Sequence, residues 1–233
     1  MGGCDSKQGS YTQGTSDVQI HGMSLSGNVI PPVLFCLDNK CGSLVPLDFM
    51  KGEHKSPEKL KINPFGQMPM MKDGDFCLGE SSAILRYLAK AYNMEAYGTT
   101  VREQAECDWA MDWAGTNFAA NEYKDIWYPV AGFGEKPADQ KKANQSAVEK
   151  LGVFADKFLQ NKKLLGGTKL SIADYKFGTL VWYLSHPAVA QDTGYKNPPR
   201  IEEYVKAWKE ALSPEAAKVL EDGWGYLDTK LKK

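Results

Sequence analysis

The first third of the chain alternates short apolar runs with polar stretches, at a spacing typical of a small sheet with helices. Apolar runs at residues 18–23 and 44–49 predict two strands. The stretch 29–39 between them predicts a helix that starts near Pro31 or Pro32, since proline is tolerated in a first turn. A crossover helix of this kind allows the two flanking strands to pair in parallel.

Turn residues divide the following segment into a hairpin. Residues 63–66, Asn-Pro-Phe-Gly, predict a turn because proline fixes φ and glycine permits φ > 0. Strands are predicted at 68–71 and 76–78, and the Asp73-Gly74 pair between them favours a tight reversal.

A helix is predicted directly after the hairpin. Ser81 or Ser82 can cap it through a side-chain hydroxyl, and its apolar face contains Ile84, Leu85 and Leu88. The first part of the chain is therefore predicted to fold in the order βαβ and then ββα.

Helical periodicity dominates beyond a predicted linker at residues 92–100. Long helices are predicted at 101–118 and 141–160. Residues 171–174, Ser-Ile-Ala-Asp, have the form of a capping box, and the helix that they open is almost wholly apolar over 177–184. That helix is predicted to be central in the bundle. A last amphipathic helix is predicted from Pro198, Pro199, Tyr204, Val205 and Trp208.

Composition restricts the class of protein. The 233 residues are 42% hydrophobic and 24% charged, as in a globular protein of one or two domains. The net charge of −1 predicts no general attraction to nucleic acid. No apolar run approaches the ~20 residues of a membrane helix, and residues 1–17 lack the apolar core of a secretory signal. Five scattered cysteines without a metal-binding or CxxC pattern predict a cytoplasmic protein without a metal site.

Two pieces of the segment 63–89 carry candidate chemistry. A cis bond between Met68 and Pro69 would turn the backbone groups of Met68 outward, where an extended peptide can pair with them. Glu80 and Ser81 stand at a predicted helix N-terminus, where free N–H groups favour a ligand carboxylate and the Glu80 carboxylate can hold an ammonium. A ligand with a peptide backbone and an α-amino-acid head fits both features, and glutathione is such a ligand.

The sequence Gly-Glu-His-Lys at 52–55 is followed by the motifs NPFGQMP, DGD and ESSAILRYLA. On these motifs the chain resembles the cytosolic glutathione transferases, most of all the phi class. The resemblance implies an α/β thioredoxin-like N-terminal domain over 18–92, an all-α C-terminal domain over 101–233, glutathione as co-substrate, and a homodimer. Residues 1–17 lie outside it, and their polar composition predicts a disordered tail.

In the resembled enzymes a serine hydroxyl after the first strand donates a hydrogen bond to the glutathione sulfur. A thiol of pKa about 8.5 is mostly protonated at neutral pH, and a donor that favours the thiolate lowers that pKa. The family pattern places the serine four residues after a glycine, so Gly22 points to Ser26 as the catalytic residue. Asn28 also matches the pattern, and Ser24 remains an alternative. Ile-Pro-Pro at 30–32 departs from it, since an arginine is expected there, and an apparent one-residue insertion is expected to shift the loop.

The resemblance also assigns the other glutathione contacts. His54 and Lys55 would contact the glycine carboxylate, and Gln67 would bind the tripeptide beside Met68. The complete predicted glutathione site is Ser26, His54, Lys55, Gln67, Met68, Pro69, Glu80 and Ser81. For the electrophile, the candidates are Met23, Leu25, Trp113, Asn117 and Tyr123.

The predicted function is conjugation of the glutathione thiolate to small hydrophobic electrophiles. One alternative is a glutathione-dependent peroxidase or isomerase, and another is a transferase-like scaffold or carrier of low activity. A thiol oxidoreductase fits less well, because reductase-type relatives carry a cysteine where this chain has Ser26. Cys36 and Cys77 fall inside predicted elements, where structural burial is expected.

The first residues, Met-Gly-Gly-Cys-Asp-Ser, fit a myristoylation pattern. Gly2 would accept the myristoyl chain and Cys4 is placed for a palmitoyl chain. Because one acyl chain binds membranes only marginally, the second would matter. The pattern predicts peripheral attachment to the cytosolic face of a membrane.

Overall fold

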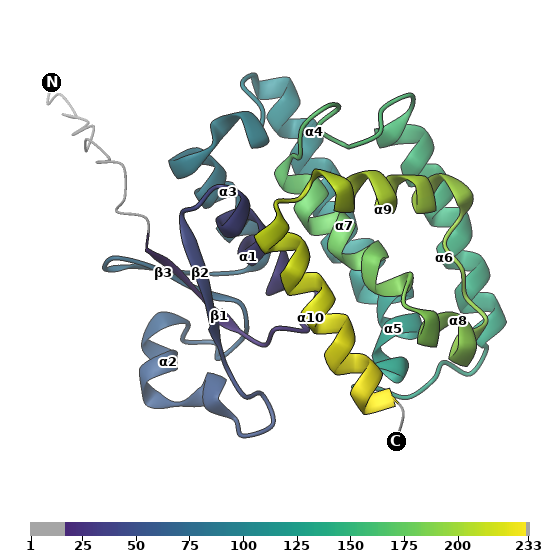
Figure 1. Ribbon diagram of the computed structural model, residues 1–233, viewed down its shortest axis with the longest axis horizontal. Helices are drawn as coiled ribbons and strands as arrows, with labels where there is room; N and C mark the ends of the chain where they lie inside the picture. Colours follow the sequence, from purple (N-terminus) through teal and green to yellow (C-terminus); the bar gives the residue numbers. More distant parts are fainter. Residues whose placement is uncertain (1–16, 232–233) are drawn as a thin grey trace, which may run out of the picture.

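The computed structural model describes residues 17–231, which form an α/β part followed by a helical part (Figure 1). The α/β part contains β1 (Val18–Gly22), α1 (Ile30–Asp38), β2 (Gly42–Pro46), the 3₁₀ turn η1 (Glu53–Lys55), α2 (Pro57–Ile62), β3 (Met70–Asp73), β4 (Phe76–Gly79) and α3 (Ser81–Tyr92). Gly2 and Cys4, with the rest of the predicted tail up to residue 16, lie outside the described residues.

The four strands form one sheet in the order β2-β1-β3-β4. β1 pairs in parallel with β2 and antiparallel with β3, and β3 and β4 form the predicted hairpin. Helix α2 lies on one side of the sheet, while α1 and α3 lie between the sheet and the helical part (Figure 1). Gly42 faces Val18 in the parallel pair, where any Cβ would lie 2.2 Å from the Val18 carbonyl oxygen. The predicted thioredoxin-like arrangement is confirmed.

The helical part begins with the 3₁₀ turn η2 (Met94–Ala96) and one long continuous helix. That helix comprises α4 (Val101–Asp112), the π-helical segment η3 (Trp113–Tyr123) and α5 (Lys124–Val130). It is followed by α6 (Gln140–Phe154), the π-helical turn η4 (Ala155–Leu159), α7 (Ile172–Leu184), α8 (Pro187–Thr193), α9 (Pro199–Ala211) and α10 (Pro214–Leu231).

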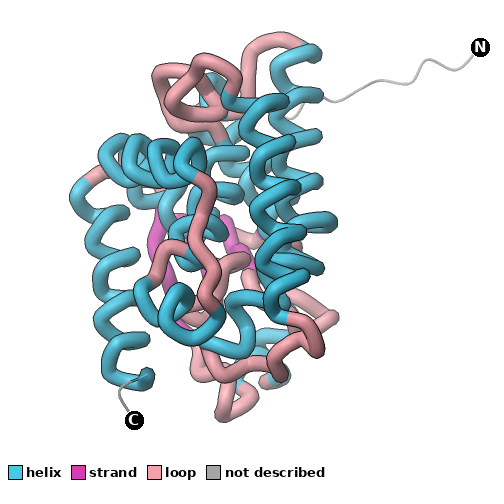
Figure 2. The backbone as a smooth tube through the Cα atoms, turned by 90° about the vertical axis from the view of Figure 1, so that its right-hand side faces the viewer, coloured by secondary structure: helices cyan, strands magenta, loops and turns pink. Residues whose placement is uncertain are grey.

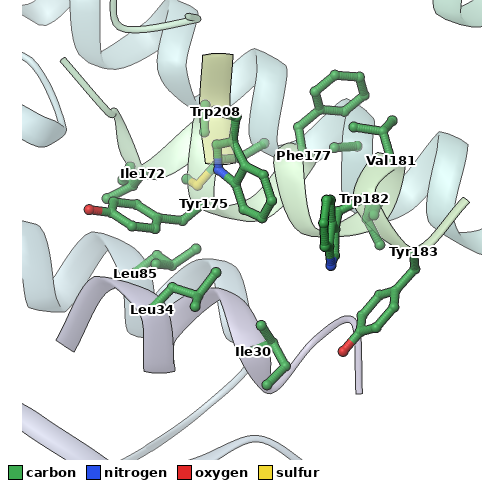
Figure 3. Packing of buried hydrophobic residues seen from close by; sticks show 14 of the residues in the cluster. Ile30, Leu34, Leu85, Ile172, Tyr175, Phe177, Val181, Trp182, Tyr183 and Trp208 are labelled. Carbon is green, nitrogen blue, oxygen red and sulfur yellow. The ribbon is translucent and has the colours of Figure 1, made fainter. Parts of the chain in front are cut away.

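Helix α7 is the centre of the molecule, and every one of its residues is buried. Its predicted capping box is present, because the Ser171 hydroxyl accepts from the Asp174 N–H and the Asp174 carboxylate accepts from the Ser171 N–H. Figure 3 shows the α7 side chains packed against Ile30 and Leu34 of α1 and Leu85 of α3. Burial of such apolar surface contributes about 25 cal/mol per Å².

Polar contacts tie the two parts together. Asp38 at the end of α1 accepts hydrogen bonds from the Tyr175 hydroxyl at 2.7 Å and the Ser213 N–H at 2.9 Å. Arg86 of α3 donates to Asp108 and Asp112 of α4 at 2.6 and 2.7 Å. Seen from the side of the helical part, the strands lie behind the helices (Figure 2).

Several predicted boundaries in the α/β part were wrong. β2 ends at Pro46 rather than at residue 49, because Pro46 faces Gly22, the last residue of its partner β1. β3 starts at Met70 rather than at Met68, since Pro69 has no N–H for the ladder. The predicted serine cap of α3 is absent: Glu80 occupies the N-cap position and no side chain caps the helix.

Four α-helices of the described residues lie outside the predicted ranges, namely α2, α5, α8 and α10. The helix predicted at 101–118 continues to Val130, and α9 is not the last helix. Glycines at 223 and 225 weaken the helical signal of α10, and its first turn is capped by the Ser213 hydroxyl. Tertiary packing supports α10, since Trp224 stacks on Trp182 of α7 with ring centroids 4.1 Å apart.

Candidate functional site

A cavity of about 900 Å³ lies where the α/β part meets the helical part. All eight residues of the predicted glutathione site line it: Ser26, His54, Lys55, Gln67, Met68, Pro69, Glu80 and Ser81. They come from four separate segments of the sequence, which the sheet and its loops bring to one place. The opposite wall is formed by residues of η3, α5 and α7.

The loop after β1 carries Ser26 to the edge of the cavity. The Ser26 carbonyl accepts from the Val29 and Ile30 N–H groups, so the turn leads directly into α1. The Asn28 N–H donates to Ser26 Oγ at 3.3 Å, which leaves the serine hydrogen free to donate to another group. The sequence Ile-Pro-Pro at 30–32, which departs from the family pattern, forms the first turn of α1. Ser26 lines the cavity despite this departure.

Asn63 organises the turn before β3. Its Nδ2 donates to the Gln67 carbonyl at 2.8 Å, and its Oδ1 accepts from the Phe65 N–H at 3.1 Å. After this turn, the peptide bond between Met68 and Pro69 is cis, as the predicted pairing of Met68 with an extended peptide requires. Met68 lies just before the first residue of β3 that pairs with β1, so the turn presents Met68 at the cavity.

Glu80 and Ser81 stand where β4 meets α3. Glu80 has the left-handed angle φ +63°, which is uncommon for a residue with a side chain and typical of positions that a surrounding structure holds in place. Its carbonyl accepts from the Ile84 N–H, and the first-turn N–H groups of α3 have no side-chain cap. The exposed Glu80 carboxylate and the buried Ser81 hydroxyl thus line the cavity together.

Lys176 of α7 reaches the same place from the helical part. Its side chain is only 2% exposed, and its Nζ donates to Ser81 Oγ at 2.6 Å and to Asn28 Oδ1 at 2.7 Å. Burial lowers the pKa of Lys176 to about 8, while the charge of Glu80 opposes this shift. The ammonium therefore links the loop after β1 to the start of α3.

His54 and Lys55 form the far polar edge of the cavity. His54 is buried and stacks on Phe49 with ring centroids 4.7 Å apart, whereas Lys55 is exposed. An exposed cation held beside a fixed imidazole can receive an anionic group at the mouth of the cavity.

The wall contributed by the helical part is largely apolar and aromatic. It contains Tyr123, Trp127, Tyr128, Phe133 and Leu180. The Tyr123 hydroxyl is buried with no hydrogen-bond partner among residues 17–231, and burial raises its pKa well above the ordinary value. A side chain at Gly27 would lie 3.0 Å from that hydroxyl, so glycine permits the Ser26 loop to approach Tyr123 closely.

Other predicted candidates lie away from the cavity. Ser24 is exposed and does not line it, and neither do Trp113 and Asn117. Trp113 instead stacks on Phe118 with ring centroids 5.7 Å apart, as part of the apolar core. The remaining electrophile candidates, Met23, Leu25 and Tyr123, do line the cavity.

The cysteines of the described residues are also remote from the cavity. Cys36 is buried in α1 as expected, and Cys77 is half-buried in β4. Within the described part of the chain, no group of His, Cys, Asp and Glu side chains is arranged to hold a metal ion. No helix among residues 17–231 is long and apolar enough to span a bilayer.

Lys176 and the turn residue Asn63 were not predicted from the sequence as parts of the site. The wall residues Trp127, Tyr128, Phe133 and Leu180 were not predicted either. A lysine immediately before the apolar run of α7 is the signal that could have revealed Lys176, because a lysine inside a buried helix is rare without a partner. Asn63 was visible only as a turn residue.

Similarity to known proteins identifies the family of this chain. Residues 43–90 match the family model of the glutathione S-transferase N-terminal domain. The curated relative glutathione S-transferase F10 of Arabidopsis thaliana is 32% identical over 183 residues, which cover 74% of this chain and 81% of the relative. The chain belongs to the glutathione S-transferase family. Glutathione S-transferase theta-1 of Bos taurus is also 32% identical, over 75% of this chain and 72% of the relative.

Solved transferases have the same fold. The crystal structure of poplar glutathione transferase F1 covers 91% of this chain and 100% of its own, with a TM-score of 0.70 and 28% identity. A glutathione S-transferase-I bound with lactoylglutathione covers 88% of this chain and 99% of its own, with a TM-score of 0.72 and 27% identity. The predicted resemblance, fold class and enzyme class are therefore confirmed at the level of the family, and phi-type enzymes are among the relatives.

Proposed function

We propose that this glutathione transferase binds glutathione in the cavity, activates its thiol with Ser26, and transfers the sulfur to a small hydrophobic electrophile. The observation that carries the proposal is the division of the cavity. One side holds hydroxyl, carboxylate and ammonium groups around Ser26 and Ser81, while the other is apolar and aromatic. A polar peptide and an apolar second substrate therefore meet beside Ser26.

Each part of glutathione has a matching group. Glu80 would hold the ammonium of the γ-glutamyl head, and Ser81 its carboxylate. The backbone of Met68, just before the cis bond to Pro69, would pair with the cysteinyl residue, with Gln67 beside it. His54 and Lys55 would hold the glycine carboxylate. In this arrangement the cysteinyl sulfur would lie between the Met68 turn and the Ser26 loop.

The chemical step needs a thiolate. Ser26 Oγ accepts from the Asn28 N–H, so its own hydrogen can point to the sulfur and stabilise the negative charge. The thiol releases its proton to solvent, and the sulfur lone pair forms a bond to the electrophilic carbon. The electron pair of the breaking bond leaves with its substituent, and no covalent intermediate with the protein is required.

Binding and turnover test this proposal separately. Calorimetry should show a dissociation constant in the millimolar to micromolar range, or about −4 to −8 kcal/mol. An aryl chloride electrophile with a chromophoric product should then be conjugated in a glutathione-dependent reaction. The absence of heat at millimolar glutathione would contradict the proposal. Binding without turnover would favour a carrier, and turnover of a hydroperoxide or a maleyl compound would favour the peroxidase or isomerase alternative.

Our proposal also includes the assembly and location of the protein. Membership of the family supports a homodimer, and the cysteine pattern supports the cytoplasm. The Met-Gly-Gly-Cys-Asp-Ser start supports acylation at Gly2 and Cys4, with the globular part held at the cytosolic face of a membrane. Sedimentation equilibrium tests the homodimer, and the mass of the native protein tests the acylation.

A further inference from the structure

Lys176 carries a buried positive charge whose hydrogen-bond partners in the described residues include no carboxylate. The side chain belongs to the fully buried helix α7, and its two hydrogen-bond partners are the neutral oxygens of Ser81 and Asn28. An ammonium has three donors, so these contacts satisfy two of them and give it no directly bonded counter-charge. The carboxylate of Glu80 attracts Lys176 without a hydrogen bond, and burial still outweighs that attraction. A buried charge that is bonded only to neutral groups destabilises a folded chain, which indicates that it serves a purpose other than stability.

The cavity offers the place where this charge can be balanced. Lys176 lines it directly beneath Ser81, at the uncapped N-terminus of α3. Because Ser81 Oγ accepts from the ammonium, the serine hydrogen does not point to Lys176 and is free to donate to a ligand. The hydroxyl and the charge behind it thus favour the same occupant, a carboxylate.

We propose that Lys176 is a positioning residue that selects the α-carboxylate of the ligand's amino-acid head, acting through Ser81. The proposal rests on the glutathione-binding function given above. Lys176 also holds Asn28 through its side-chain oxygen, and the Asn28 N–H contacts Ser26 Oγ. Occupation of the head-group site is thereby connected to the loop that carries the catalytic serine, by a residue from the other part of the molecule.

A change in protonation should accompany binding. Burial lowers the pKa of Lys176 to about 8, and a carboxylate beside Ser81 would raise it again. Above pH 8, binding should therefore take up part of a proton. Glu80 is the charged group that faces Lys176 from the start of α3, and His54, Lys55 and Tyr123 are further titratable groups lining the cavity. S-methylglutathione is the suitable probe, because its blocked sulfur releases no proton.

The test is a cycle that changes the protein and the ligand in turn. Lys176→Met removes the charged amine and keeps an unbranched side chain that is one atom shorter. The ligand counterpart is S-methylated 4-aminobutanoyl-cysteinylglycine, which lacks only the head-group carboxylate of S-methylglutathione. The matched control is Lys218→Met, which removes the same charge from an exposed position on α10.

We expect Lys176→Met to weaken S-methylglutathione binding about 10- to 100-fold, the range for a hydrogen bond to a charged group. It should leave the affinity for the carboxylate-free analogue unchanged. It should also reduce the proton uptake measured at pH 8.5 in two buffers of different ionisation enthalpy, and the part that remains comes from the amino group of the ligand. In turnover with glutathione, KM should rise much more than kcat falls. Lys218→Met should match the wild type throughout.

Thermal unfolding followed by circular dichroism shows whether the variant folds, and we expect an unchanged or higher midpoint because a buried charge is removed. If Lys176→Met does not fold, Lys176→Gln is measured in the same way. If Lys176→Met loses the same affinity for both ligands, or loses affinity for neither, the role of Lys176 is overturned while the proposed function stands. If the wild type binds neither ligand at millimolar concentration, the proposed function fails and this role fails with it.

Discussion

In the proposed function, single hydroxyl groups carry the chemistry, and what each can donate to depends on which neighbour already bonds its oxygen. Ser26 Oγ and Ser81 Oγ each accept one hydrogen bond from within the protein, from the Asn28 N–H and from Lys176 respectively. Each hydrogen is consequently available to a ligand. Ser24 differs from both, since it is exposed and does not line the cavity.

Ser26→Ala should raise the pKa of the bound glutathione thiol by about one to two units, or about 1.4–2.7 kcal/mol, because a donor to the thiolate is lost. Conjugation at neutral pH should fall by about 10- to 100-fold, while glutathione binding changes little. Titration of the thiolate absorbance measures the shift directly. Ser24→Ala is the matched control, and a defect that appears there and not in Ser26→Ala would transfer the catalytic role to Ser24.

His21 should make the fold sensitive to mild acid. Its side chain is buried at the end of β1, its Nδ1 lies 3.1 Å from Lys59 Nζ, and burial, with Lys59 and Lys72 adding to it, lowers its pKa to about 4. Between pH 6.5 and 4, His21 binds a proton in the unfolded chain but stays neutral in the folded chain. The free energy of unfolding therefore falls as the pH falls.

Urea denaturation should therefore show that the free energy of unfolding of the wild type is lower at pH 5 than at pH 7, with a contribution on the order of 1–2 kcal/mol that His21→Asn lacks. Subtracting the two proteins removes the contribution of the carboxyl groups, which titrate in both. Parallel pH profiles for the wild type and the variant would show that His21 does not cause the acid sensitivity.

Among the elements, α7 depends on one carboxylate. Asp174 accepts from the N–H groups of Leu165, Gly166 and Ser171 at 2.8–2.9 Å, and from the hydroxyls of Ser171 and Tyr204. Burial raises the pKa of this carboxyl, and the hydrogen bonds from Ser171, Gly166 and Leu165 oppose that rise. Its loss would leave several buried donors without partners, each at a cost of about 1–3 kcal/mol.

Asp174→Ala should accordingly lower the free energy of unfolding by about 3 kcal/mol or more, a change that urea denaturation measures. Asp139 provides the matched control, because it caps α6 through a single exposed bond to the Lys142 N–H. Asp139→Ala should cost about 1 kcal/mol. Equal effects of the two substitutions would contradict the central position assigned to α7.

Elements marked by local chemistry were predictable, and elements that depend on contacts were less so. The capping box at Ser171 and the turn at Gly74 act through neighbouring backbone groups, so the sequence displays them. Helix α10 contains two glycines and relies on the contact between Trp224 and Trp182, which no local pattern reveals. The absent serine cap of α3 has the same cause, since Ser81 Oγ is bound by a lysine 95 positions away.

Across the whole molecule, the predictable part of the site is the part carried by one domain. The segment 52–82 shows its glutathione-binding pattern in its motifs. The apolar wall and Lys176 come from helices whose apolar residues have the same periodicity whether they face the core or the cavity. Only the way in which the two parts pack together separates Tyr123, at the cavity, from Trp113, in the core.

Location is also a property of the whole chain. If Gly2 is acylated, the protein should partition to membranes, Gly2→Ala should release it completely, and Cys4→Ser should release it partly. The reason is that a single remaining chain binds with a constant of only about 10⁴ M⁻¹. Fractionation of cells that express each variant measures the partition. A native mass without acyl groups, together with a wholly soluble fraction, would contradict the attachment.

The π-helical stretch from Trp113 to Tyr123 bears on how such a pocket can diversify between lineages. Removing one residue from a helix rotates everything beyond it by about 100° relative to everything before it. Here the residues beyond include Tyr123, Trp127 and Tyr128, which all face the cavity. Gain or loss of one residue within this stretch would therefore change the direction of three aromatic side chains at once. Point substitutions would have to alter these side chains one by one. We expect enzymes descended from a common ancestor to differ in the length of this helix as well as in its side chains, and to differ in substrate range accordingly.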